Sequence, residues 1–150
     1  MAYHALNSDE TADLSEAQVN DLDGRISVIM PVYNGADFIP LSLPPLIDMM
    51  HRGEILEVIV VDDGSTDGSK QMAETIGAKV LSSGGRLGPG GARNQAANTA
   101  LGDILWFVDA DVVVHSDAAR RLGIGFDIEQ VVAVLESYDI SRRPRTFFSQ

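Results

Sequence analysis

The feature that most constrains the fold of this chain is a regular alternation of short apolar runs with longer stretches of helical spacing. Five runs are mostly apolar at consecutive positions, at residues 26–32, 56–61, 78–81, 104–108 and 131–135. Strands that are apolar on both faces are typical of a parallel sheet with helices on both sides. The alternation therefore predicts an α/β fold, with a Rossmann-like, mostly parallel sheet flanked by helices.

Four helices are expected between and after these strands. In the first, Ile39, Leu43 and Leu46 follow helical spacing. Pro44 and Pro45 remove backbone donors within it, so we expect this helix to start late or to kink. The others are expected at about residues 68–76, 92–101 and 116–123, with a glycine-rich loop at residues 82–91.

Length, cysteine content and charge limit the class of protein. The chain has 150 residues, which fits one domain, and it has no cysteine, which excludes a disulfide scaffold and thiolate chemistry. Its net charge is −11, and residues 1–24 contain six acids but no Lys or Arg. We expect residues 1–24 to form a flexible acidic leader and residues 25–150 to form the folded domain.

The same charge bears on partners and location. An acidic domain is a poor candidate for binding nucleic acid or an anionic membrane surface. No apolar run approaches the roughly 20 residues that a membrane span needs, and the N-terminus lacks the basic-then-apolar pattern of a signal peptide. We therefore expect no membrane span in this chain and cytoplasmic residence.

Polar or glycine-rich clusters directly follow the first, second and fourth predicted strands. They lie at residues 33–35, 62–67 and 109–111. In an open α/β sheet, ligands bind beyond the carboxyl ends of the strands. The sequence therefore predicts a site at that edge of the sheet, together with the glycine-rich loop.

Asp109 and Asp111 are the sharpest candidates for metal binding. Residues at positions i and i+2 of an extended chain point to the same side, so both carboxylates can face one point. A hard divalent cation such as Mn²⁺ or Mg²⁺ would relieve their repulsion, and such a cation commonly accompanies a phosphate-containing substrate. The alternative is a solvated acidic turn at a strand end.

Three further groups are candidates for ligand binding. Asp62 or Asp63 can accept hydrogen bonds from a base or a ribose, or the acids here serve only turns and helix capping. The glycine-rich loop, the helix start after it and Arg93 suit a phosphate, or they form a mobile connector. Tyr33 can stack on a nucleobase, or it packs as a half-buried tyrosine.

In combination, the motifs are more specific than any one of them. Four segments occur in order, ISVIMPVYN at 26–34, EVIVVDDGSTD at 57–67, GPGGARN at 88–94 and LWFVDAD at 105–111. This set resembles the N-terminal, nucleotide-sugar-binding half of family 2 glycosyltransferases, which have the GT-A fold. The resemblance covers about residues 26–118. It implies that the partner is a nucleotide-diphospho-sugar donor.

The resemblance also implies roles for individual residues on the base side of the donor. Pro31, Tyr33 and Asn34 would line the base pocket, with the Tyr33 ring stacked on the base. Asp63 would accept a hydrogen bond from a uracil-like N3–H, and Asp62 would support it nearby.

On the phosphate side, the resemblance implies that Arg93 lies close to the donor diphosphate. Asp109 would face the ribose or the metal shell, and Asp111 would be the direct ligand of Mn²⁺ or Mg²⁺. The metal would act as a Lewis acid on the departing diphosphate.

The general base of sugar transfer is not identified. Several acids follow Asp111, namely Asp117, Asp127, Glu129, Glu136 and Asp139, but none lies in a recognisable base motif. We therefore expect a truncated GT-A domain whose acceptor half is absent and which transfers sugar poorly alone. We expect it to associate with itself through an exposed sheet edge or apolar face.

Two alternative functions remain open at this point. One is a non-enzymatic α/β remnant that binds a nucleotide or a partner. The other is a phosphatase similar to haloacid dehalogenases, in which Asp109 would be the nucleophile.

Overall fold

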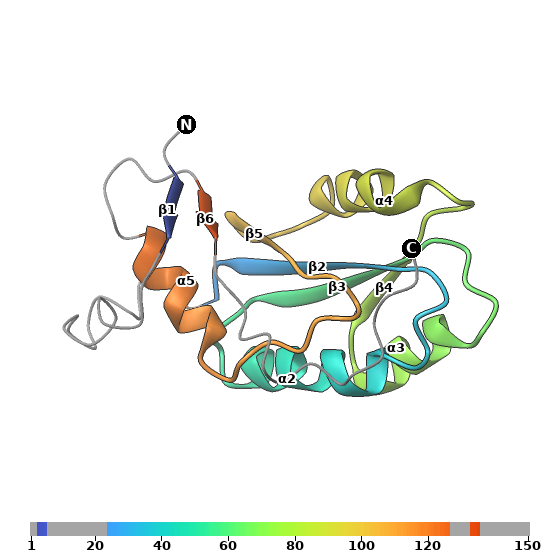
Figure 1. Cartoon of the computed structure of the whole chain (residues 1–150), viewed down its shortest axis with the longest axis horizontal. Helices are drawn as coiled ribbons and strands as arrows, with labels where there is room; N and C mark the ends of the chain where they lie inside the picture. Colours follow the sequence, from blue (N-terminus) through green and yellow to red (C-terminus); the bar gives the residue numbers. More distant parts are fainter. Residues whose placement is uncertain (1–2, 6–23, 127–132, 136–150) are drawn as a thin grey trace.

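The computed structural model describes residues 3–5, 24–126 and 133–135. A four-stranded parallel sheet forms the centre of the described structure (Figure 1). Its strands are β2 (Ile26–Val32), β3 (Glu57–Asp62), β4 (Lys79–Ser82) and β5 (Ile104–Phe107), in the spatial order β4-β3-β2-β5. The predicted α/β class is confirmed, and these four strands begin and end within one residue of the predicted positions.

The two middle strands, β2 and β3, form the buried centre of the sheet. Every residue of β3 is buried, and Val28 pairs in register with Val58 on the neighbouring strand. Side chains alternate between the faces of a strand. Val28 and Met30 therefore point to one face of the sheet, and Ile29 points to the other.

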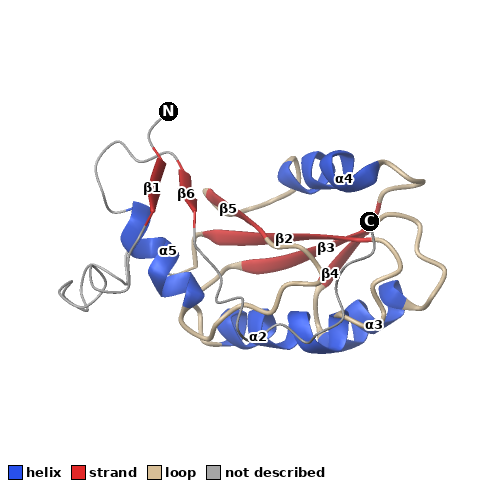
Figure 2. Ribbon diagram, in the orientation of Figure 1, coloured by secondary structure: helices blue, strands red, loops and turns tan. Residues whose placement is uncertain are grey.

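Helices cover both faces of the sheet (Figure 2). The helices α2 (Ile39–His51) and α3 (Ser69–Ile76) lie on one face, and α4 (Gly88–Ala97) lies on the other. The α2 face holds the larger hydrophobic cluster, to which α5 (Ala118–Phe126) contributes Leu122. The smaller cluster beneath α4 consists of Ile29, Ile59, Val61, Ala92 and Ala96. None of the helices in the described ranges is long and apolar enough to cross a membrane.

Of the late start or kink predicted for α2, the late start is wrong. The helix begins at Ile39, with Pro40 in its first turn, and continues past Pro44 and Pro45. A proline inside a helix costs about 3 kcal/mol or more, through the lost hydrogen bond and the clash of its ring with the preceding turn. The apolar side of the helix offsets this cost because each buried apolar side chain contributes about 1.5–3 kcal/mol, and these side chains are Ile39, Leu43, Leu46, Ile47 and Met49.

The helix predicted at residues 92–101 lies four residues earlier in the chain. Observed α4 starts at Gly88 and ends at Ala97, so residues 88–91 of the predicted glycine-rich loop are helical. Pro89 suits the first turn of a helix. The Asp63 carboxylate, distant in sequence, accepts hydrogen bonds from the N–H groups of Leu87 and Gly88 and so caps this start. Helix α5, by contrast, begins two residues later than predicted, at Ala118.

The fifth predicted strand does not join the central sheet. Its observed part, β6 (Ala133–Leu135), pairs in parallel with β1 (Tyr3–Ala5) as a separate two-stranded sheet. Strand β1 falls within the segment that the sequence analysis treated as a leader. Residues 1–2 and 6–23 of that segment lie outside the described residues, as do the candidate acids Asp127, Glu129, Glu136 and Asp139.

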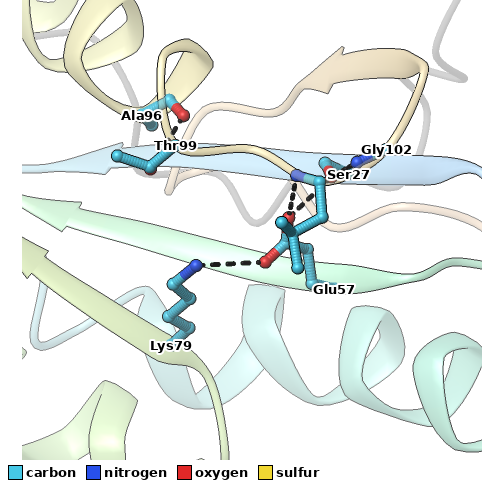
Figure 3. A network of polar contacts seen from close by, with 7 residues as sticks. Ser27, Glu57, Lys79, Ala96, Thr99 and Gly102 are labelled. Atoms are coloured by element: carbon cyan, nitrogen blue, oxygen red, sulfur yellow. Dashed lines mark hydrogen bonds and ion pairs between the residues drawn. The ribbon is translucent and has the colours of Figure 1, made fainter.

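The buried carboxylate of Glu57 joins neighbouring strands at the amino ends of the sheet strands, opposite the predicted site. Glu57 accepts hydrogen bonds from the Ser27 hydroxyl at 2.8 Å and from the Leu101 N–H at 2.7 Å, and it pairs with Lys79 (Figure 3). Burial alone would raise the pKa of Glu57, but these hydrogen bonds and the Lys79 charge lower it below its ordinary value. Glu57 was not among the residues predicted from the sequence to have a role.

Candidate functional site

The carboxyl ends of β2, β3 and β5 meet at one edge of the sheet, as predicted. The Asp63 N–H donates to the Val32 carbonyl at 2.8 Å, which joins the segments that follow β2 and β3. An added Cβ on Gly35 would lie 3.8 Å from the Ala110 side chain, so the turn after β2 also approaches the segment after β5. The polar clusters of the sequence are therefore neighbours in space.

Asn34 shapes the turn after β2. Its φ of 48° places it in the left-handed region, where asparagine is tolerated better than most residues. Its N–H donates to the Ser65 hydroxyl, and its side-chain oxygen accepts from the Thr66 N–H, both at 2.9 Å. The Asn34 side chain thus holds the turn after β2 against the turn after β3.

Two acids of the 62–67 segment serve these turns. Buried Asp62 accepts from the Ser65 N–H at 3.2 Å. Asp67 accepts from the Ser69 hydroxyl, from the Ser69 N–H and from the Ala36 N–H. The Ser69 hydroxyl contributes most to lowering the pKa of Asp67 below its ordinary value. Asp67 thus accepts from the N–H of the first residue of α3, which agrees with the helix-capping interpretation of this segment.

Asp63 connects β3 to the start of α4. Only 4% of the residue is exposed, and its two carboxylate oxygens accept from the Leu87 N–H at 2.7 Å and the Gly88 N–H at 2.8 Å. The Leu87 hydrogen bond is the main reason that the pKa of Asp63 lies below its ordinary value. The carboxylate therefore stays charged near neutral pH and fixes one end of the glycine-rich segment.

The aromatic ring of Tyr33 is available at this edge but is not bare. The residue is 43% exposed, and the Arg86 guanidinium carbon lies 3.8 Å from the ring centroid. That distance is typical of a cation–π contact. Arg86 was not among the predicted site residues, because an arginine in a glycine-rich loop gives no signal of which ring it will cover.

Arg93 and Asp109 form an ion pair between α4 and the segment after β5. Both side chains are partly exposed, at 34% and 57%. Within the described residues, the Arg93 Nε atom is buried and has no hydrogen-bond partner, so this guanidinium retains donor capacity. The Asp109 carbonyl accepts from the Val112 N–H at 3.0 Å and closes a tight turn around Asp111.

The fit of a divalent metal depends on the two aspartates of this turn. Asp109 and Asp111 are both exposed, and they offer the carboxylate oxygens that Mn²⁺ and Mg²⁺ prefer. No group of three or more potential metal ligands occurs among the residues that the structure describes. The tight turn also replaces the extended chain on which both carboxylates were expected to face one point, so a metal held here would need further ligands from phosphate and water.

Comparison with known proteins decides the family. Residues 27–147 match the family described as glycosyl transferase family 2. The chain belongs to this family. The predicted relationship is therefore confirmed, and it favours the glycosyltransferase interpretation of Asp109 over the phosphatase one.

Two curated relatives illustrate the match within the family. The chain is 37% identical over 106 residues to a poly(ribitol-phosphate) beta-glucosyltransferase of Bacillus spizizenii, a match covering 65% of this chain and 16% of the relative. It is 32% identical over 121 residues to an uncharacterized glycosyltransferase of a Nostoc species, covering 77% and 37%. The chain thus spans well under half the length of these family members.

Solved structures of the family agree on the fold. Staphylococcus aureus TarS (residues 1–349) in complex with UDP-GlcNAc matches with a TM-score of 0.62 and 33% identity, over 69% of this chain and 31% of that one. Mycobacterium tuberculosis glucosyl-3-phosphoglycerate synthase with Mn²⁺, UDP and glucosyl-3-phosphoglycerate matches with a TM-score of 0.61 and 28% identity, over 77% and 43%. The GT-A fold predicted from the family resemblance is confirmed.

Proposed function

We propose that this chain binds the nucleotide-diphospho-sugar donor of a glycosyltransferase, as a UDP-sugar, for transfer of the sugar to an acceptor. One observation carries the proposal. The segments after β2, β3 and β5 and the start of α4, which hold the family motifs, lie together at one sheet edge. The complexes of TarS with UDP-GlcNAc and of glucosyl-3-phosphoglycerate synthase with UDP support the choice of nucleotide.

On the base side, the proposal uses the ring of Tyr33 and the carboxylate of Asp63. The exposed tyrosine offers a flat apolar surface on which a base can stack. A carboxylate has about four lone-pair sites, and Asp63 uses two of them for the Leu87 and Gly88 N–H groups and is also in hydrogen-bond contact with the Ser83 hydroxyl. It therefore keeps capacity to accept from a uracil N3–H. Pro31 and Asn34 flank this place at the end of β2 and in the turn after it, and Asp62 supports it from the end of β3.

On the phosphate side, the proposal uses Arg93 and the two aspartates. Arg93 lies where its guanidinium can donate to the diphosphate while remaining close to Asp109. Asp111, with Asp109, would hold Mn²⁺ or Mg²⁺, and the Mn²⁺ in one neighbouring family structure supports this choice. When bound, the metal neutralises charge that develops on the leaving diphosphate.

Titration calorimetry with UDP tests the proposal. Wild-type chain should bind UDP when MnCl₂ or MgCl₂ is present and bind it weakly in EDTA. Asp111→Asn should weaken metal-dependent binding by roughly tenfold or more, since even residues that only orient metal ligands contribute about 10–100-fold. Asp48→Asn, an exposed aspartate on α2, is the matched control and should bind like wild type. Absence of UDP binding with either metal would refute the proposal.

Self-association remains a prediction, and the described sheet indicates which strand would carry the contact. β5 lies at one end of the strand order, and its Leu105 and Phe107 side chains are exposed. If this edge drives association, sedimentation velocity should show dimers whose fraction falls in Phe107→Ser.

A further inference from the structure

One short segment, residues 83–88, reaches both places where the proposed function requires the donor base. Arg86 lies over the ring of Tyr33, with 3.8 Å between its guanidinium carbon and the ring centroid. The N–H groups of Leu87 and Gly88 occupy the carboxylate oxygens of Asp63. We call residues 83–88 the cover segment.

The guanidinium of Arg86 lies over the face of the Tyr33 ring. A guanidinium is planar and stacks on aromatic faces much as a second ring does. A nucleobase stacked on that ring face would need the same space. The guanidinium and the base therefore cannot occupy that face together.

The position of Arg86 relative to Asp63 also indicates that Arg86 occupies the space that a base would need. A base that stacks on Tyr33 and donates its N–H to Asp63 must lie between these two residues. Arg86 contacts the first, and its charge contributes to the lowered pKa of the second. An added Cβ on Gly64, the residue after Asp63, would lie 3.9 Å from the Arg86 side chain.

We propose that Arg86 is a built-in occupant of the base-stacking face of Tyr33, and that donor binding requires its displacement. The inference rests on the proposed function, because it concerns the same base. It adds a residue that controls donor affinity and that no part of the family pattern assigns. Arg86 thus acts as an autoinhibitory contact within the donor site.

The cover segment is built so that Arg86 can leave while the segment stays attached. Gly84 has a φ of 78°, and an added Cβ on either Gly84 or Gly85 would meet nothing within 4 Å. Two glycines in open space give the backbone before Arg86 wide conformational freedom. Beyond Arg86, the hydrogen bonds to Asp63 hold Leu87 and Gly88. Displacement of Arg86 therefore does not require α4 to move.

The first test measures affinity for UDP and for inorganic pyrophosphate, each with MnCl₂, by titration calorimetry. Arg86→Ala should bind UDP about two- to fivefold more tightly than wild type, the factor that corresponds to loss of one exposed cation–π contact. Pyrophosphate has no base, so its affinity should stay the same or fall. In the Tyr33→Leu background, Arg86→Ala should no longer tighten UDP binding. Arg120→Ala, on the exposed side of α5, is the control for loss of one positive charge.

The second test follows Arg86 directly by NMR. In wild type, the Arg86 Nε–H signal should be shifted by the ring current of Tyr33, and Tyr33→Leu should abolish this shift without any ligand. Saturating UDP with MgCl₂ should abolish it in wild type.

The outcomes separate the inference from the proposed function. If wild type binds UDP but Arg86→Ala binds it no more tightly, or if the ring-current shift survives saturation with UDP, the inference is wrong and the proposed function stands. Equal tightening for pyrophosphate would show a general charge effect and would also overturn the inference. If neither wild type nor Arg86→Ala binds UDP, both the inference and the proposed function fail.

Discussion

Arg93, in α4, forms an ion pair with Asp109, sixteen residues later in the segment after β5. The pair joins a residue expected to contact the donor phosphates to one expected near the metal. In this arrangement the guanidinium balances the charge of the Asp109 carboxylate. A diphosphate and a metal arriving together would bring opposite charges to the same pair, so the local charge balance need not change greatly on binding.

Replacing Arg93 should affect the phosphates of the donor and not its base. We expect Arg93→Gln to weaken UDP binding by roughly tenfold, since hydrogen bonds to charged groups contribute about 1.5–3 kcal/mol. Uridine binding should be unchanged, because uridine carries no phosphate. Calorimetry with both ligands and with Arg120→Gln as control measures the difference, and an equal loss for uridine would place Arg93 outside the phosphate contact.

Neutralising Asp63 should loosen the start of α4. In Asp63→Asn, one of the N–H groups of Leu87 and Gly88 loses its carboxylate acceptor, so hydrogen exchange at these amides should be faster than in wild type. Because the pKa of Asp63 is lowered in the folded chain, its stabilising effect is complete above the unfolded-state pKa and is lost as the pH falls through the folded-state pKa.

Urea unfolding at neutral and acidic pH tests that dependence. Asp63→Asn should unfold at lower urea than wild type at pH 7, and the gap should close in the acidic range below the ordinary pKa of an aspartate. Asp48→Asn should show no gap at either pH. A gap for Asp63→Asn that is independent of pH would contradict the assigned role.

Glu57 should stabilise the fold without contributing to donor binding. Glu57→Gln removes the charge that binds Lys79 and leaves part of the buried network poorly matched, so we expect a loss of about 1–3 kcal/mol in the free energy of unfolding. The pKa of Glu57 is also lowered, so this contribution fades as the pH falls through its folded-state pKa. Glu74→Gln, exposed on α3, is the control, and unchanged stability in Glu57→Gln would refute the role.

Two glycines offer a matched test of backbone packing. An added Cβ on Gly102 would lie 2.4 Å from the Arg25 carbonyl oxygen and 2.7 Å from the Ser27 nitrogen, so Gly102→Ala should destabilise the fold strongly. Gly90 lies within α4, and an added Cβ there meets nothing within 4 Å. Gly90→Ala should therefore be neutral or stabilise by up to about 1 kcal/mol, the helix preference of alanine over glycine. Thermal unfolding of both variants compares them, and equal effects would contradict the packing described for Gly102.

The parts of the fold predicted from sequence are those that depend on local pattern. Strands β2 to β5 are short, apolar runs ended by polar residues, and such runs determine both the sheet and the edge at which the motifs meet. The stop of α3 at Gly77 was also predictable, because the residue adopts the left-handed conformation, with a φ of 114°, that favours glycine at a helix end.

The errors of prediction come from contacts between distant parts of the chain. The start of α4 depends on Asp63, and the sequence around Gly88 gives no sign of that contact. Pro44 and Pro45 predicted a late start or a kink of α2. The burial of apolar side chains that offsets the cost of these prolines depends on the rest of the fold, so the local sequence does not show it. Arg86 and Glu57 have side-chain partners far away in sequence, so neither belonged to a recognisable motif.

The attachment of α4 to Asp63 has a consequence for the order in which the molecule forms. The first turn of α4 is rich in glycine, a poor helix former, and has no side-chain cap from its own N-cap residue, Leu87. A peptide of this segment alone should remain largely unstructured in water. The turn becomes favourable only once β3 has presented Asp63. We therefore expect this part of the proposed donor site to become ordered only after β3 has joined the sheet.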